Sequence, residues 1–157
     1  RQMCIRADNT YWIGATEITD NTITTDETGA ICTQYPISTL LNKQIQFQLK
    51  STIQDYFIGI SNTNYEICGY TVQDNTPVLI NQANDTTIEV PPAKIGVENT
   101  YTILYTNNTL TITYTGDEEQ TVTKTIDTTG IDPETYYLAF HTTANNEIYI
   151  KNITIEE

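Results

Sequence analysis

The stretch from Tyr101 to Thr115, YTILYTNNTLTITYT, constrains the fold of this chain more than any other. Large apolar residues alternate with smaller ones along both halves, and Asn107-Asn108 separates the halves as a two-residue turn. Such alternation is typical of half-buried strands, and a two-residue turn fixes the register of a hairpin. The pattern therefore predicts an antiparallel hairpin in which Tyr105 faces Leu110, Ile103 faces Ile112 and Tyr101 faces Tyr114.

The composition favours strands along the rest of the chain. Threonine occurs 31 times and isoleucine 22 times, against seven leucines and seven alanines. Beta-branched residues suit a pleated sheet, whereas helices draw on alanine and leucine. The segment QIQFQLK at 44–50 alternates, and YFIGIS at 56–61 is apolar almost throughout, as expected for a central strand covered on both faces. We expect an all-β fold, a two-sheet antiparallel β-sandwich of the jelly-roll type, with little or no helix.

The length of 157 residues suits one domain over 1–157. Residues 1–36 are weakly patterned and are expected to form an N-terminal arm or an irregular segment, with two short strands around Asp20-Asn21 or a long loop. The chain opens at Arg1, which indicates a processed mature protein or one domain of a longer one. No stretch approaches the ~18 to 20 apolar residues of a membrane span, so no membrane insertion is expected.

The net charge of −13 restricts the partners of this chain. An acidic surface repels phosphate backbones and anionic lipids, so we expect no nucleic-acid partner. A neutral glycan or calcium is compatible with this charge, which also discourages association between sheet edges. No cofactor is expected other than calcium, whose candidate ligands are Asp20-Asn21, Asp74-Asn75 and Asn84-Asp85, although Asx residues also simply make turns.

Three cysteines, Cys4, Cys32 and Cys68, show no CxxC spacing. Their number allows one disulfide with the pairing left open, and Cys68 also suits a plain core position. A disulfide would favour an oxidising, extracellular setting. Three Asn-x-Thr sequons are candidates for glycosylation, at Asn84, Asn107 and Asn152.

Several segments, taken in order, resemble the concanavalin A-like jelly roll of legume-type lectins and laminin G-like modules. They are IQFQLK at 45–50, YFIGIS at 56–61, YTILYTNNTLTITYTG at 101–116 and YYLAFHTTANNEIYIKNITI at 136–155. The resemblance implies a jelly roll. Glucanases of this fold carry a Glu-x-Asp-x-Glu strand, which this sequence lacks, and the lectins' metal-binding loop is not recognisable. The resemblance therefore transfers neither catalysis nor a metal site.

The titratable residues do not suggest an enzyme. The acidic run Asp117-Glu118-Glu119 is expected in an exposed turn, and the lone His141 has no identifiable nucleophile beside it. The aromatic residues are more informative, because sugar rings stack on tryptophan and tyrosine while amides fix their orientation. Four aromatic residues beside polar loops are the predicted ligand-binding residues, each of them alternatively a core residue: Trp12, Tyr35, Tyr65 and Tyr70.

These observations lead to a first hypothesis of a non-catalytic extracellular recognition module. It would bind a glycan or a host-surface protein, on a virion fibre or a cell-surface adhesin. The alternative is a structural subunit of an extracellular filament or capsid, a homo-oligomer that assembles by β-strand addition through the N-terminal arm. A third hypothesis, an immunoglobulin-like stalk domain, predicts fewer strands.

Overall fold

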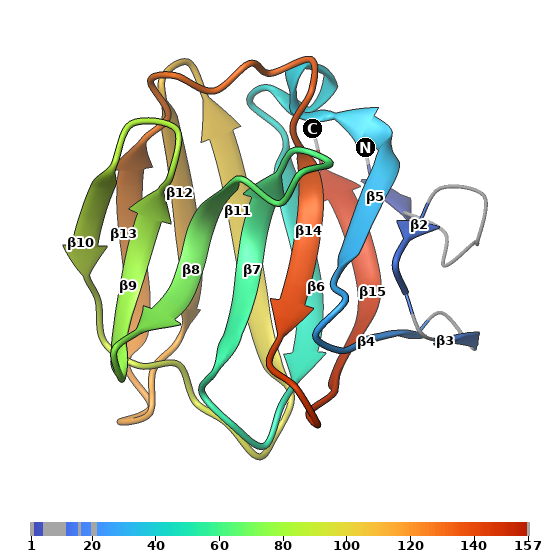
Figure 1. The fold of residues 1–157 in the computed structure, drawn as a ribbon, viewed down its shortest axis with the longest axis vertical. Helices are drawn as coiled ribbons and strands as arrows, with labels where there is room; N and C mark the ends of the chain where they lie inside the picture. Colours follow the sequence, from blue (N-terminus) through green and yellow to red (C-terminus); the bar gives the residue numbers. More distant parts are fainter. Residues whose placement is uncertain (1, 5–11, 16, 20–21, 157) are drawn as a thin grey trace.

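The computed structural model describes residues 2–4, 12–15, 17–19 and 22–156, with the backbone alone for 2–4 and 17–19. These residues form fifteen strands in two antiparallel sheets packed face to face (Figure 1). The predicted two-sheet β-sandwich is confirmed. The helical part of the described residues is the 3₁₀ turn Ile37–Leu40, and no helix there is long and apolar enough to cross a membrane.

Sheet I has eight strands and contains both β1 and the last strand, β15. Its order is β13 (Thr121–Asp127), β12 (Thr109–Thr115), β11 (Asn99–Thr106), β6 (Gln44–Lys50), β15 (Ile148–Glu156), β4 (Thr22–Thr25) and β3 (Glu17–Thr19), with β1 (Gln2–Cys4) beside β15. The strands β6 and β15 therefore lie in the middle of this sheet.

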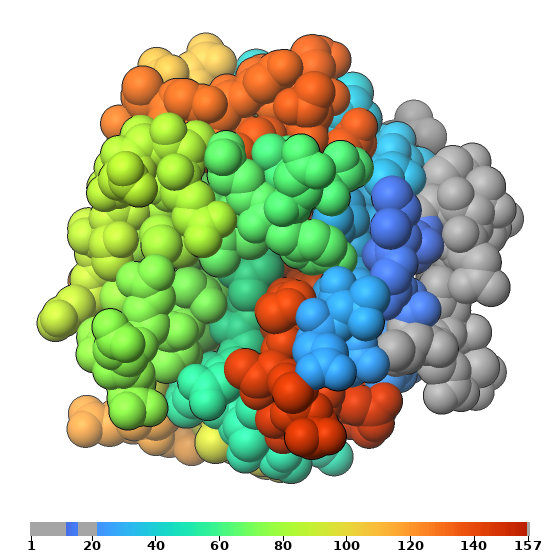
Figure 2. Space-filling model, in the orientation of Figure 1, coloured from blue at the N-terminus to red at the C-terminus, as the bar shows by residue number. Residues whose placement is uncertain are grey.

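Sheet II has seven strands and faces the viewer in Figure 1. Its order is β10 (Thr86–Glu89), β9 (Thr76–Asn81), β8 (Ile67–Gln73), β7 (Tyr56–Ser61), β14 (Tyr137–Thr142), β5 (Ala30–Pro36) and β2 (Trp12–Ile13). The connection from β13 to β14 crosses one end of the sandwich, seen in orange at the top of Figure 2.

The hairpin of β11 and β12 has the predicted register. Ile103 faces Ile112, and Tyr105 faces Leu110. The rings of Tyr101 and Tyr114 stack with their centroids 5.5 Å apart. The central strand β7 is buried at every position, as its continuous apolar sequence predicted.

The described parts of residues 1–36 contribute β1 to β5. The strands β3 and β4 form a hairpin around Asp20-Asn21, in agreement with the prediction of two short strands, although these two turn residues lie outside the described part. The strand β5 pairs with β14 in the interior of sheet II. No strand was expected there.

One hydrophobic cluster joins the two sheets. Phe47 of sheet I meets Phe140 of sheet II edge to face, with ring centroids 5.0 Å apart. The Trp12 ring stacks on Phe140, with ring centroids 5.9 Å apart. The core thus consists of the inward-facing residues of both sheets, and a smaller buried cluster of Ile31, Phe57 and Ala139 lies on the outer face of sheet II.

The predicted disulfide is wrong. Cys32 on β5 and Cys68 on β8 are free and buried, so no pair can close within a chain of three cysteines. Both point into the core, where they pack as small apolar residues. Burial raises the pKa of the Cys32 thiol to about 11 and that of Cys68 to about 12. The side chain of Cys4 lies outside the described part.

Candidate functional site

Tyr149 is the one large aromatic side chain that is exposed among the residues whose side chains the structure describes, at 44%. It lies on β15 between Ile148 and Ile150, which are both fully buried. Because side chains alternate along a strand, the inward-facing isoleucines direct Tyr149 to the outer face of sheet I. The ring therefore presents an accessible aromatic surface on a central strand of sheet I, near the end where that strand begins.

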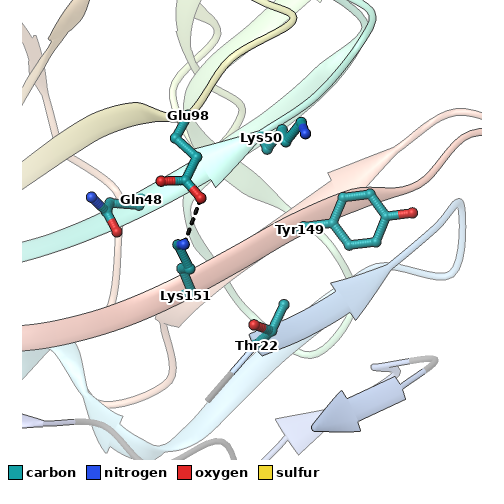
Figure 3. Close-up of a pocket in the computed structure, with 6 residues that line it drawn as sticks. All are labelled: Thr22, Gln48, Lys50, Glu98, Tyr149 and Lys151. Atoms are coloured by element: carbon teal, nitrogen blue, oxygen red, sulfur yellow. Dashed lines mark ion pairs between the residues drawn. The ribbon is translucent and has the colours of Figure 1, made fainter. Parts of the chain in front are cut away.

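A hollow of about 180 Å³ lies beside this ring. Its lining defines what we call the Tyr149 surface: Thr22, Gln48, Lys50, Glu98, Tyr149 and Lys151 (Figure 3). The sheet register brings these residues together, because Lys50 faces Tyr149 across the strands and Gln48 faces Lys151. Thr22 enters from the neighbouring strand β4. Three adjacent strands thus build one polar rim around an aromatic ring.

The Tyr149 surface carries two lysines and one glutamate, a net charge of +1. Lys151 Nζ lies 2.5 Å from Glu98 Oε1, and both side chains are about half exposed. Exposed pairs of this kind contribute roughly 0 to 1 kcal/mol to stability, so this pair mainly positions its members. Lys50 makes no ion pair with any described residue and leaves its ammonium group free for a ligand.

A second hollow of about 230 Å³ adjoins the first and shares Lys50 and Tyr149 with it. Its other lining residues come from the loop after β6 and the loop before β15: Ser51, Thr52, Asn145, Asn146 and Glu147. The Tyr149 ring is thus flanked on two sides by hydroxyl, amide and charged groups. A ring with such neighbours suits a sugar, whose apolar face stacks on the ring while its hydroxyls form hydrogen bonds.

The four aromatic residues predicted to bind ligand do not form one shelf. Trp12 and Tyr70 are core residues, 6% and 0% exposed, so neither offers a ring face to a ligand. Tyr35 is half-buried against the core, and its hydroxyl accepts a hydrogen bond from Gln34 Nε2 at 3.2 Å. Tyr65 lies on the outer face of sheet II. The side chains of Trp12 and Tyr70 face inward from their strands. Their closeness to polar loops in the sequence, on which the prediction of ligand binding rested, does not indicate which way a strand residue faces.

Tyr65 lines a smaller hollow of about 150 Å³ on sheet II with Phe57, Ile67, Thr71 and His141. The Tyr65 and His141 rings lie 5.9 Å apart. The Tyr65 hydroxyl is buried with no hydrogen-bond partner among the residues that the structure describes. This hollow is smaller than the one beside Tyr149, and no lysine or arginine lines it.

The predicted calcium ligands that the structure describes make turns. Asp74 and Asn75 both take left-handed φ angles in the two-residue turn between β8 and β9. The Asn84 side chain accepts the N–H of Thr86 at 3.1 Å. Within the described ranges no three or more His, Cys, Asp or Glu residues gather as a metal site would require.

Two of the three sequons lie on exposed turns or bulges. Asn107 is exposed at the tip of the β11–β12 hairpin, and Asn152 is exposed on β15 beside the Tyr149 surface. Asn84 is half-buried. Glycosylation at these positions stays a prediction.

Comparison with known proteins places this geometry in a recognised fold. No protein-family model and no curated protein sequence matches the chain. Among solved structures it is similar to the exoplasmic/lumenal domain of VIP36 in a Ca²⁺/Man3GlcNAc-bound form, with 9% identity over 93% of this chain and 82% of that one and a TM-score of 0.61.

Two further structures show the same likeness. A seed lectin of Lotus tetragonolobus is 13% identical over 98% of this chain and 96% of its own, with a TM-score of 0.57. A provisionally assigned glycosyl hydrolase of Parabacteroides distasonis is 15% identical over 95% of this chain and 89% of its own, with a TM-score of 0.56. At these identities the likeness is one of fold, and it agrees with a concanavalin A-like jelly roll.

Proposed function

We propose that this chain is a non-catalytic glycan-recognition module whose ligand stacks on Tyr149. The observation that carries the proposal is an exposed tyrosine ring on a central strand of sheet I, with an amide, a hydroxyl, a free ammonium group and an ion pair around it. Lectins among the structures of similar fold support it. Acidic charge elsewhere on the chain leaves an uncharged sugar as the better partner than a polyanion.

A glycan array probed with the wild-type protein and with Tyr149→Ala tests the proposal. We expect the wild type to bind a defined set of glycans and the variant to lose at least about tenfold in affinity, because a stacked aromatic anchor supplies much of the energy of such a site. Tyr149→Phe keeps the ring and is the matched control, so it should retain most of the binding. The array is run with and without calcium.

Two results contradict the proposal. One is that the wild type binds no glycan under either condition. The other is that Tyr149→Ala binds as tightly as the wild type. The binding site would then lie elsewhere, and the Tyr65 hollow would be the next candidate. Circular dichroism of each variant verifies that the fold is intact.

We further propose that the module acts outside the cell, as part of a virion fibre or a cell-surface adhesin. The exposed sequon at Asn107, on the tip of the β11–β12 hairpin, and a strongly acidic surface support this setting. Antibody labelling of intact cells or particles tests it, since a protein displayed outside is labelled without permeabilisation. Labelling only after permeabilisation would contradict it.

A further inference from the structure

A third hollow lies on the same outer face of sheet I, at the far end of the strands that carry Tyr149. It has a volume of about 390 Å³ and is lined by Asn42, Gln44, Leu104 and Glu156. Gln44 faces Glu156 across β6 and β15, as Lys50 faces Tyr149. The hollows therefore lie at opposite ends of one strand pair.

The outer face between these ends is polar along its whole length. From β6 it presents Gln44, Gln46, Gln48 and Lys50 at every second position. From β15 it presents Tyr149, Lys151, Asn152, Thr154 and Glu156. We call this strip of nine residues the β6 track. Its ends, Gln44 and Lys50, lie six residue steps apart on β6, which at about 3.4 Å per step gives a length of roughly 20 Å.

A β-bulge in β15 keeps the track polar. The register with β6 shifts between Lys151 and Thr154, and Asn152 takes a left-handed φ of 55° there. Without the bulge, the alternation set by Ile148 and Ile150 would turn the later isoleucines of the strand to the outer face. The bulge also directs Asn152 Nδ2 to Gln48 Oε1, 2.8 Å away, so that two amides of the track hold each other in place.

Together with the adjacent Glu98, the charges of the track sum to zero, which favours a neutral ligand over a strongly anionic one. Lys50 and Lys151 are offset by Glu98 and Glu156, and the chain as a whole carries −13. Amides and hydroxyls, which dominate the remaining positions, both donate and accept hydrogen bonds and suit a neutral chain of hydroxyl groups.

We propose that the β6 track binds an extended, neutral polysaccharide chain that lies along β6, with Tyr149 at one end and Gln44 at the other. The inference rests on the proposed function at the Tyr149 surface and specifies its ligand. A disaccharide is too short to reach both ends of a strip of roughly 20 Å, whereas a longer chain contacts both. Affinity therefore depends on chain length.

Calorimetric titration with linear β-1,4-linked gluco-, manno- and xylo-oligosaccharides of two to six units tests this inference. The affinity for at least one series should rise with length until the chain spans the track and then remain constant. Gln44→Ala should lower the affinity for the hexasaccharide by about five- to tenfold and leave that for the disaccharide unchanged, whereas Tyr149→Ala lowers both. Gln73→Ala, an exposed glutamine on sheet II, is the matched control and should change neither.

The outcomes separate this inference from the proposed function. Equal affinities for short and long chains would contradict the inference that the ligand is extended. An effect of Tyr149→Ala without any effect of Gln44→Ala would contradict it too, and either result would indicate a compact ligand at the Tyr149 surface. The inference also falls if none of the three series binds while another glycan binds in a Tyr149-dependent manner. If nothing binds at all, the proposed function falls with it.

Discussion

At the scale of single residues, Gly29 determines where the Tyr65 ring can lie. Its φ is +79°, and a Cβ at this position would come within 2.7 Å of the Tyr65 ring. Gly29→Ala should therefore cost more than the roughly 1 to 2 kcal/mol of a left-handed alanine, because the ring must also move. Urea denaturation measures the loss in the free energy of unfolding.

Gly96 is the control for this substitution. Its φ of +84° is similar, but no atom lies within 4 Å of a Cβ placed there. Gly96→Ala should show the cost of the left-handed conformation alone. Equal losses for the two variants would mean that the Tyr65 ring yields freely and does not depend on Gly29.

The outward orientation of Tyr149, the main residue of the candidate site, could have been predicted from the sequence. The same alternation that predicted the core face of the β11–β12 hairpin also directs Tyr149 outward between two isoleucines. The same argument applies to Tyr70, because Cys68, Tyr70 and Val72 alternate with Gly69, Thr71 and Gln73, and the prediction that Tyr70 binds ligand came from its neighbouring polar loop instead. Sequence patterns thus determine which residues share a face, and the second sheet determines which face is covered.

At the scale of elements, the edge strand β13 has a lysine at a position that discourages another strand from pairing with it. Lys124 alternates with the buried Val122 and Ile126 and faces Ile112, yet it is exposed. A charge at an inward-facing position of an edge strand discourages pairing with another chain. The filament or capsid alternative, which stays a prediction, would therefore need a different edge.

We expect Lys124→Val to associate more than the wild type, because the substitution gives β13 an uninterrupted apolar face. Light scattering over a range of concentrations measures the apparent mass. Thr125→Val is the control, since it adds the same side chain on the opposite, outer parity of the strand. An unchanged mass for Lys124→Val, or an equal increase for both variants, would contradict the role of the lysine.

Some strands and bulges could be predicted from the sequence and others could not. The bulge in β15 was foreseeable, because the isoleucines of its two halves have opposite parity. The strand β5 was not, since AICTQYP at 30–36 lacks alternation and ends in proline. Its strand conformation comes from pairing with β14 on one side and β2 on the other. Tertiary pairing decides such segments more than local propensity does.

At the scale of the whole molecule, a cluster of four buried tyrosines joins the two sheets. Tyr56 and Tyr70 belong to sheet II, and Tyr101 and Tyr114 to sheet I. The Tyr70 ring lies 5.2 Å from that of Tyr114 and 6.4 Å from that of Tyr101. The hydroxyls of Tyr56 and Tyr101 bond to each other, and Tyr70 donates to Gln54 Oε1 and accepts the N–H of Ala93, each at 3.1 Å. The contact between the two sheets thus includes four neutral phenol side chains.

Burial makes this cluster sensitive to alkaline pH. It raises the pKa of Tyr70 to about 12 and those of Tyr56 and Tyr101 further, because phenolate is poorly solvated in the core. In the unfolded chain a tyrosine has a pKa of about 10. Below that pH the phenols are neutral in both states, and the contribution of the cluster to stability is complete. Above it the unfolded state loses protons that the folded state retains, so the free energy of unfolding decreases.

We expect the free energy of unfolding to be insensitive to these phenols below about pH 10 and to fall above it by up to about 1.4 kcal/mol per pH unit for each buried tyrosine. Urea denaturation at a series of alkaline pH values measures the slope, and phenolate absorbance measures ionisation at the same time. Tyr70→Phe removes one titrating group and should reduce the slope between about pH 10 and pH 12 by one tyrosine, whatever its effect on stability at neutral pH. The prediction fails if phenolate forms near pH 10 in the folded protein without any loss of stability. That result would show that water reaches the tyrosine cluster and that the two sheets pack less tightly than the ring contacts imply.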